Sequence, residues 1–174
     1  KNCTTRRLSL RRLQLKDYAA WVHSHRVSLP KQNKFDLPPR AHSQLGLALF
    51  KRNVRRHQKL AKNDQTYIWN IFLRSTGELV GWIDVSTICR EPHQMANLGY
   101  FVINTYRRKG YAEEAVRKIV NASFRDLKYH RLEAAMDPDN RASVALARTC
   151  GFKREGLKKY YWFQNGRWED QMVY

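Results

Sequence analysis

A cationic turn in the middle of the chain is the first candidate for chemistry. The stretch YRRKGYA at residues 106–112 follows an apolar, strand-like run at 98–103 and leads directly into a helix-forming stretch. The first N–H groups of a helix lack partners within it, and a glycine lets an anion approach them closely. The turn therefore predicts a pyrophosphate site, and a solvated basic turn is the alternative. The residues concerned are Arg107, Arg108, Lys109 and Gly110.

Positive charge is concentrated in the first third of the chain. The formal net charge is +18, and residues 1–60 hold 15 Lys and Arg residues against only Asp17 and Asp36. A field of this kind speeds encounter with polyanions and weakens with salt. One stripe of cations on the helix predicted for 41–62 is either an RNA contact or a solvated helix face. This stripe consists of Arg52, Arg55, Arg56 and Lys59.

Length and composition favour a single globular domain over residues 1–174. The chain is 43% hydrophobic, which is enough to bury a core, and no apolar run approaches the roughly 18 residues that span a bilayer. Without a signal-peptide pattern, we expect a soluble, cytoplasmic protein with no membrane contact. Cys3, Cys89 and Cys150 lie far apart and form no CxxC pair, so we expect reduced thiols and no metal site.

Hydrophobic periodicity predicts alternating strands and helices. An α/β (α+β) fold follows, with one mixed, mainly antiparallel sheet and helices on both faces. Asn165-Gly166 is a strong hairpin signal near the end of the chain. The expected helices are 16–27, 41–62, 112–127 and 142–149, and the expected strands are 6–13, 66–75, 79–87, 94–103, 131–136 and two more around that turn.

Several blocks of the sequence together resemble a known family. Arg107-x-x-Gly110-x-Ala112 after a strand is similar to the acetyl-CoA signature of the GNAT N-acetyltransferases. The blocks at 137–143, 151–156 and 165–170 are similar to the RimJ/RimL type of ribosomal-protein N-acetyltransferases. The resemblance implies the GNAT fold and acetyl transfer from acetyl-CoA to a primary amine. The acceptor implied first is the N-terminal α-amino group of a ribosomal protein.

The resemblance also implies which residues hold acetyl-CoA. The turn would wrap the pyrophosphate through its main chain, and the strand before it would splay from its neighbour to hold the pantetheine arm. Asn140 would contact the cofactor too, although it could simply cap the helix that follows. The implied main-chain contacts are Phe101, Val102, Ile103, Arg107, Arg108, Lys109, Gly110, Tyr111 and Ala112.

The catalytic assignments rest on two residues. Many GNAT enzymes have a tyrosine seven residues after the matching Asn, but here that residue is Ala147, so Ser143 becomes the candidate donor to the departing thiolate. A structural serine is the alternative. The usual base position reads Ala96-Asn97-Leu98, which leaves Asp84 as the nearest candidate base by position. An exposed, ion-paired aspartate is the alternative for Asp84, with water accepting the proton.

Three functions remain open on the sequence alone. The first is acetylation of a protein N-terminus, with the basic first third guiding the enzyme to ribosomal RNA. The second is acetylation of a small amine, such as an amino acid, a polyamine or an antibiotic. The third is a non-catalytic ribosome-associated module. The sequence leaves open whether the protein is a monomer or a homodimer.

Overall fold

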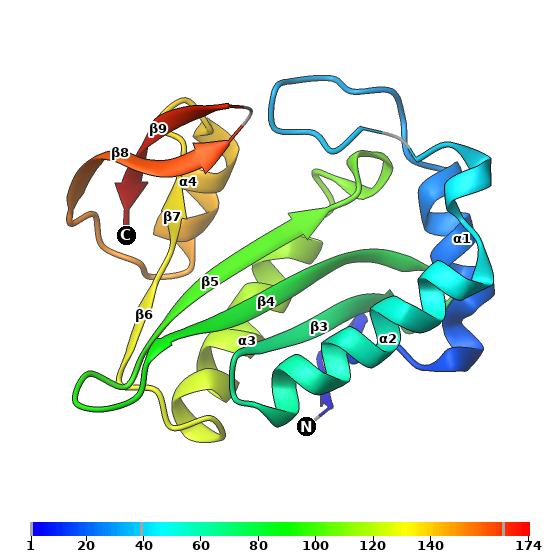
Figure 1. Ribbon diagram of the computed structural model, residues 1–174, viewed down its shortest axis with the longest axis horizontal. Coiled ribbons are helices and arrows are strands. Elements are labelled where there is room, and N and C mark those ends of the chain that lie inside the picture. The colour runs from blue at the N-terminus through cyan, green and yellow to red at the C-terminus, as the bar shows by residue number, and fades with distance from the viewer. Residues whose placement is uncertain (1, 39, 165) are drawn as a thin grey trace.

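The computed structural model describes residues 2–38, 40–164 and 166–174. Its strands form two sheets (Figure 1), a six-stranded sheet in the order β1-β2-β3-β4-β5-β6 and a three-stranded sheet in the order β7-β9-β8. All neighbouring strands are antiparallel except β5 and β6. The strands are β1 (Cys3–Thr4), β2 (Leu8–Arg11), β3 (Thr66–Leu73), β4 (Leu79–Cys89), β5 (Met95–Val102), β6 (Arg131–Glu133), β7 (Ala135–Met136), β8 (Gly156–Gln164) and β9 (Arg167–Val173).

Helices cover both faces of the larger sheet, as Figure 1 shows. Helices α1 (Tyr18–Arg26) and α2 (Leu47–Lys62) lie on one face, and α3 (Tyr111–Arg125) lies on the other. Helix α4 (Arg141–Thr149) packs against the smaller sheet. Three short 3-10 turns, η1 (Leu15–Asp17), η2 (His42–Gln44) and η3 (Asn104–Tyr106), complete the secondary structure of the described residues.

Alternation along the strands separates the two layers of the core. In β3, Ile71 belongs to the cluster that packs on α3, while its neighbour Phe72 belongs to the cluster beneath α1 and α2. Phe50 of α2 is fully buried beside Trp21 of α1, with ring centroids 5.3 Å apart. Both helices are therefore held by large apolar side chains, and their remaining faces stay free to line a site.

The parallel pair β5 and β6 separates after three residues. Met95 to Asn97 pair with Arg131 to Glu133, and no later residue of β5 pairs with β6. One residue further along, Ala134 exchanges two main-chain hydrogen bonds with Tyr174, and β7 then pairs with β9. The second half of β5 thus has one edge without a strand partner among the described residues.

The structure confirms the α/β prediction of a mainly antiparallel architecture with helices on both faces. The prediction of a single sheet is wrong, because the strand predicted at 131–136 divides at Ala134 between two hydrogen-bonded sheets. The helix predicted at 41–62 begins only at Leu47, because Gly46 before it has an extended backbone. Gly166 has the positive φ of +80° that the predicted hairpin turn needs, whereas Asn165 lies outside the described residues.

Within those residues, the structure shows no helix long and apolar enough to cross a membrane. Over the same part of the chain, no group of three or more His, Cys, Asp and Glu side chains is arranged to hold a metal ion. The three cysteines are free thiols.

Candidate active site

The turn before α3 has the geometry of an anion site. Gly110 caps the helix with φ of +76°, a left-handed conformation that glycine adopts without a Cβ penalty. Among the described residues, the N–H groups of Tyr111, Ala112 and Glu113 have no main-chain acceptor. The exposed side chains of Arg108 and Lys109 form no ion pair within the described chain. Free N–H groups at the positive end of the helix, beside two unpaired cations, fit the diphosphate of acetyl-CoA.

Arg7 holds this turn in place, which the sequence did not indicate. Its Nη1 donates to the carbonyl of Lys109 at 2.8 Å, and its Nε donates to Oε2 of Glu114 at 2.6 Å. Thr5 donates to the other oxygen of Glu114 at 2.6 Å. Burial acts in the opposite direction, but these hydrogen bonds hold the pKa of Glu114 below its usual range. The turn is therefore braced by a segment a hundred residues away in the chain.

The side chain of Arg107 serves a different purpose from the one predicted. Its Nη1 lies 2.7 Å from Oδ1 of the buried Asp36, and its Nε donates to the carbonyl of Val102 at 3.1 Å. Asp36 therefore offsets the charge of the guanidinium, which makes the Arg107 side chain a weaker candidate for phosphate contact than Arg108 or Lys109. Its main chain remains a candidate contact.

Strand β5 offers fewer main-chain groups than predicted. The N–H of Ile103 donates to the carbonyl of Val80 at 3.0 Å, so it is not available to a cofactor. Hydrogen-bonded and non-bonded pairs alternate in an antiparallel ladder, so Phe101 also faces β4, whereas Tyr100 and Val102 face the free edge. The predicted main-chain contact at Val102 is consistent with this free edge of β5. The predicted main-chain contacts at Phe101 and Ile103 do not fit it, whereas Tyr100, which was not predicted, does.

Asn140 and Ser143 lie at the start of α4. Asn140 caps this helix, since its Oδ1 accepts the N–H of Ser143 at 3.2 Å. Tyr100 donates from its hydroxyl to the carbonyl of Ser143 at 2.8 Å, and burial raises the pKa of Tyr100 to about 12. The half-buried hydroxyl of Ser143 also lies beside the Tyr100 hydroxyl, and this side-chain hydrogen bond lowers the pKa of Tyr100 against the larger effect of burial. Both the main chain and the hydroxyl of Ser143 thus lie against Tyr100 of β5.

A pocket of about 790 Å³ lies between α1, α2 and the larger sheet. Its wall includes Trp82 and Phe101, whose rings stack with centroids 4.5 Å apart. Asp84 is the only carboxylate among the described residues that line it. A cavity of this size, mainly apolar and with a few polar groups, is typical of an acceptor site.

The carboxylate of Asp84 is mostly buried in this pocket. It lies against Gly99 of β5, where an added Cβ would come within 2.7 Å of Oδ1. Burial raises its pKa, and among the described residues only the Ser86 side chain donates to it, at 3.4 Å. No described residue forms an ion pair with Asp84, so the exposed, ion-paired alternative is wrong. A carboxylate with a raised pKa is matched to proton transfer.

Asp84 and Ser143 approach neighbouring residues of β5 from different sides. Asp84 lies over Gly99 on the α2 face, and Ser143 is held by Tyr100, whose side chain packs in the α3 layer. Both contacts lie just beyond Asn97, where the pairing of β5 with β6 ends. The structure thus brings a candidate base and a candidate thiolate donor to one section of one strand.

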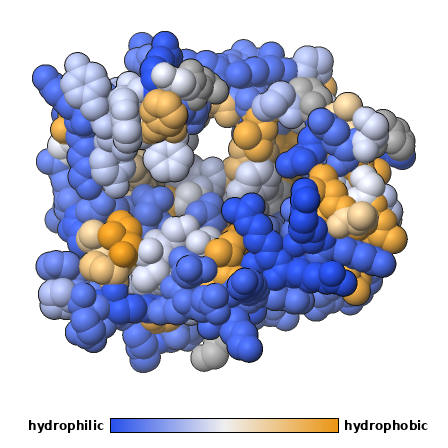
Figure 2. All heavy atoms as spheres, viewed as in Figure 1, coloured by the Kyte–Doolittle hydropathy of each residue, from blue (hydrophilic) through white to orange (hydrophobic). Residues whose placement is uncertain are grey.

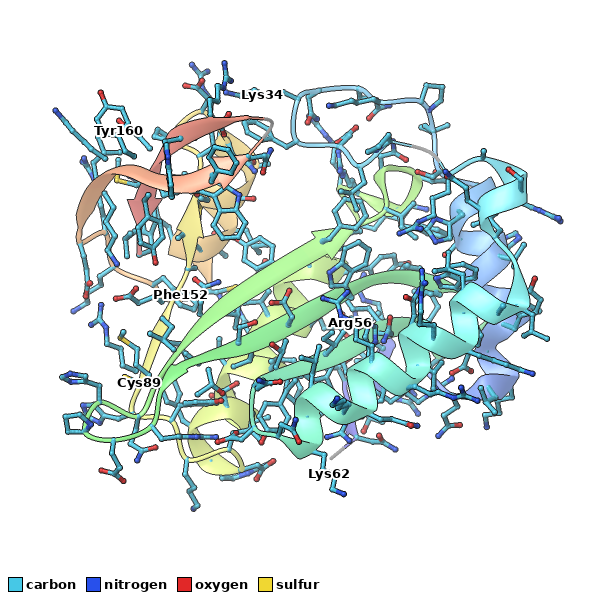
Figure 3. The ribbon with its side chains drawn as sticks, in the orientation of Figure 1. Lys34, Arg56, Lys62, Cys89, Phe152 and Tyr160 are labelled. Atoms are coloured by element: carbon cyan, nitrogen blue, oxygen red, sulfur yellow. The ribbon has the colours of Figure 1, made fainter. Side chains whose placement is uncertain are left out.

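The opening beside this section of β5 is bounded by two segments. Figure 2 shows it between the β8–β9 hairpin and the loop that follows α1. Lys34 of that loop, labelled in Figure 3, pairs with Asp137 at 3.0 Å and with Asp139 at 2.9 Å. The exposed aromatic side chains of the hairpin, Tyr160, Tyr161, Trp162, Phe163 and Trp168, do not line the pocket.

Comparison with known proteins agrees with this geometry. The family model of the acetyltransferase (GNAT) domain matches residues 7–153, so the chain belongs to the GNAT family of acetyltransferases. Enzymes of this family transfer an acetyl group from acetyl-CoA to an amine, and acetyl-CoA is accordingly the cosubstrate of this protein. The aligned part covers 71% of the chain and 68% of the Bacillus subtilis protein named "Probable N-acetyltransferase YjcK", at 34% identity.

Other relatives carry names that include a ribosomal substrate. The [Ribosomal protein uS5]-alanine N-acetyltransferase of Escherichia coli is 27% identical over 64% of this chain and 58% of its own length. A Vibrio cholerae protein named provisionally as a ribosomal-protein-serine acetyltransferase has a TM-score of 0.80 at 26% identity, covering 99% of this chain and 95% of its own. RimJ of Mycobacterium smegmatis, solved with CoA-disulfide, shares the fold with a TM-score of 0.77 at 23% identity over 95% of this chain and 79% of its own.

Gly110→Trp is expected to abolish most CoA binding. A side chain at this position would fill the space above the free N–H groups, and its Cβ would already lie 3.2 Å from Nη2 of Arg7. Gly77→Trp is the matched control, since Gly77 has the same φ of +76° in a hairpin turn with open space around it. Calorimetry with CoA should show at least a tenfold weaker Kd for the first variant only. If the two folded variants bind CoA with equal Kd, the diphosphate does not bind at this turn.

Proposed function

We propose that this protein acetylates the N-terminal α-amino group of a protein, foremost a ribosomal protein. The observation that carries the proposal is the half-buried Asp84 carboxylate in a pocket beside the point where β5 and β6 separate. The names of the uS5-alanine and ribosomal-protein-serine acetyltransferases support this substrate class. A ribosomal acceptor would place the protein in the cytoplasm.

Asp84 serves as the base in this proposal. An amine attacks a thioester only as the neutral species, so one of its protons must pass to an acceptor. Asp84 takes that proton, the nitrogen forms a bond to the carbonyl carbon, and the carbon–sulfur bond breaks. Its raised pKa makes the carboxylate a stronger base than an ordinary aspartate.

Ser143 and the free edge of β5 stabilise the charges that develop. The Ser143 hydroxyl donates a hydrogen bond to the departing thiolate, while Asn140 caps the helix that carries it. The N–H groups of Tyr100 and Val102 face the opening, where one of them can donate to the carbonyl oxygen of the thioester. Donors held by a sheet and by a capped helix are already oriented before the reaction starts.

The diphosphate of acetyl-CoA binds the turn before α3 in this scheme. The contacts are the main chain from Arg107 to Ala112, together with the side chains of Arg108 and Lys109. The pantetheine arm then runs along the free edge of β5 at Val102, and Asn140 lies at its far end.

A basic surface on α2 would guide the enzyme to its substrate. Arg52, Arg55 and Lys59 are exposed on the side of α2 that faces away from the sheet, and none forms an ion pair with a described residue. Arg56, predicted as part of the same stripe, is exposed as well, but it lines the pocket. We therefore propose that the RNA contact consists of Arg52, Arg55 and Lys59.

A small amine is the second candidate acceptor. The pocket of about 790 Å³ favours it, because a cavity of this size can enclose a small molecule. Mass spectrometry after incubation with acetyl-CoA distinguishes the two. Acetylation of short peptides at the N-terminal amine supports the first proposal, and acetylation of free amino acids or antibiotics alone supports the second.

Ser143→Ala is expected to lower kcat by about tenfold to a thousandfold, because one donor to the leaving group is lost. The KM for acetyl-CoA should stay near the wild-type value, since the diphosphate turn is untouched. The assay is steady-state acetylation of a peptide found active by mass spectrometry. Ser75→Ala, in the exposed turn between β3 and β4, is the control. A wild-type kcat in Ser143→Ala would leave this serine with a structural role only.

Replacing Arg52, Arg55 and Lys59 together with glutamate should weaken ribosome binding and flatten its salt dependence. The rate with a short neutral peptide should persist, because these side chains lie outside the pocket. Co-sedimentation with ribosomes across a salt series measures the first effect. If wild type does not sediment with ribosomes, or if the variant sediments equally well, the three cations only solvate the helix.

A further inference from the structure

Two exposed arginines at the pocket have no carboxylate partner among the described residues. Arg40 and Arg56 line the cavity from the loop before α2 and from α2 itself, and neither forms an ion pair with a described residue. Figure 3 shows Arg56 on the side of α2 that faces β4, whereas Lys62 points away from the sheet. Since Asp84 is the only carboxylate among the described lining residues, the pocket carries more positive charge than negative.

Helical spacing separates Arg56 from the outer cations of α2. Asn53, Arg56 and His57, at positions i, i+3 and i+4, all line the pocket, while Arg52 and Arg55 do not. Arg56 thus belongs to the acceptor cavity, and it can be tested apart from the proposed RNA contact.

The histidines beside these arginines are neutral at pH 7. Burial, followed by the charge of Arg40, lowers the pKa of His25 to about 4. Burial, followed by the charge of Arg56, lowers the pKa of His57 as well. The pKa of Asp84 is shifted by burial, Ser86 and its own main chain, and not by an arginine. The guanidinium groups of Arg40 and Arg56 therefore supply the positive charge of the pocket.

Two buried polar atoms of the same pocket lack partners. Within the described chain, neither Nδ2 of Asn70 nor Nδ1 of His57 has a hydrogen-bond partner. Buried polar atoms are nearly always paired, so an unpaired amide nitrogen and an unpaired imidazole nitrogen in one cavity indicate a polar ligand. Nδ2 of Asn70 is a donor, which an oxygen-rich group would satisfy.

We propose that the acceptor carries an anionic group, a carboxylate or a phosphate, which binds Arg40 and Arg56 while the amine of the same molecule lies at Asp84. For a protein substrate, this group is an acidic side chain within the first few residues. The inference rests on the proposed function for the position of the amine. It adds a recognition element that neither the acetyl-CoA turn nor Ser143 provides.

The test is a pair of amidated pentapeptides with a free N-terminal alanine that differ only in Asp against Asn at positions two to four. Calorimetry on the CoA-saturated enzyme should show the acidic peptide binding about tenfold or more tightly. Arg56→Gln and Arg40→Gln should each remove most of this difference. Lys62→Gln is the control at the end of α2, outside the pocket and the proposed RNA contact, and it should retain the difference, which excludes simple attraction to a basic protein.

Two further ligands separate failure of this inference from failure of the proposed function. If neither peptide binds, the same titration is repeated with free glutamate and with 2-aminoethyl phosphate. Binding of either one that Arg56→Gln or Arg40→Gln abolishes supports the anionic acceptor and contradicts the protein N-terminus. Equal affinity for the two peptides contradicts the anionic acceptor while leaving N-terminal acetylation standing, and the absence of binding by all four ligands contradicts the inference.

Discussion

The separation of β5 from β6 is the constraint on which the rest of the site depends. The two strands pair over only three residues, and Ala134 then binds Tyr174 of the second sheet. Main-chain groups of a strand need partners, so the free edge of β5 is available to a ligand that supplies them. In an acetyltransferase that uses acetyl-CoA, the pantetheine arm has the amide groups to do so.

The same separation explains why the chemical groups come from different layers. The pocket with Asp84 lies under α1 and α2, the diphosphate turn begins α3, and Ser143 lies on α4 against the smaller sheet. Gly99 and Tyr100 are adjacent on β5 and contact Asp84 and Ser143 respectively. A rigid strand thus sets the positions of the two candidate catalytic residues relative to each other.

The sequence predicts the parts of this site that depend on local pattern. Gly110 before a helix and cations around it indicate an anion site without knowledge of the fold, and the alternation of Ile83, Asp84 and Val85 correctly places Asp84 on the face opposite its neighbours. The sequence pattern did not predict how far the Asp84 side chain is buried. The ion-paired alternative failed because the walls of the pocket come from α1, α2 and β5, whose packing leaves Asp84 without an ion-pair partner among the described residues.

Contacts between residues that are distant in the sequence account for the remaining differences between the sequence predictions and the structure. Arg7 and Lys109 are far apart in sequence and meet only because β2 and α3 pack together. Arg107 has the same type and spacing as a phosphate ligand, yet Asp36 from a distant loop offsets its charge. The division into two sheets at Ala134 also depends on Tyr174, which is distant in the sequence and exchanges two main-chain hydrogen bonds with Ala134. The local sequence pattern around either residue of such a contact does not predict the contact.

Replacing Asp84 with asparagine tests the central claim most directly, if the rate of peptide acetylation and the Tm are measured on the same variant. Loss of the base should lower kcat/KM by about a hundredfold to ten thousandfold. Burial raises the pKa of Asp84 in the folded state, so the charged carboxylate lowers stability at neutral pH, and this cost disappears as the pH falls below both its folded and unfolded pKa. The neutral asparagine should therefore have a higher Tm than wild type near pH 7, and the difference should shrink in acid. A near wild-type rate, or a slow variant that is also less stable at neutral pH, would contradict the assignment of Asp84 as the buried base.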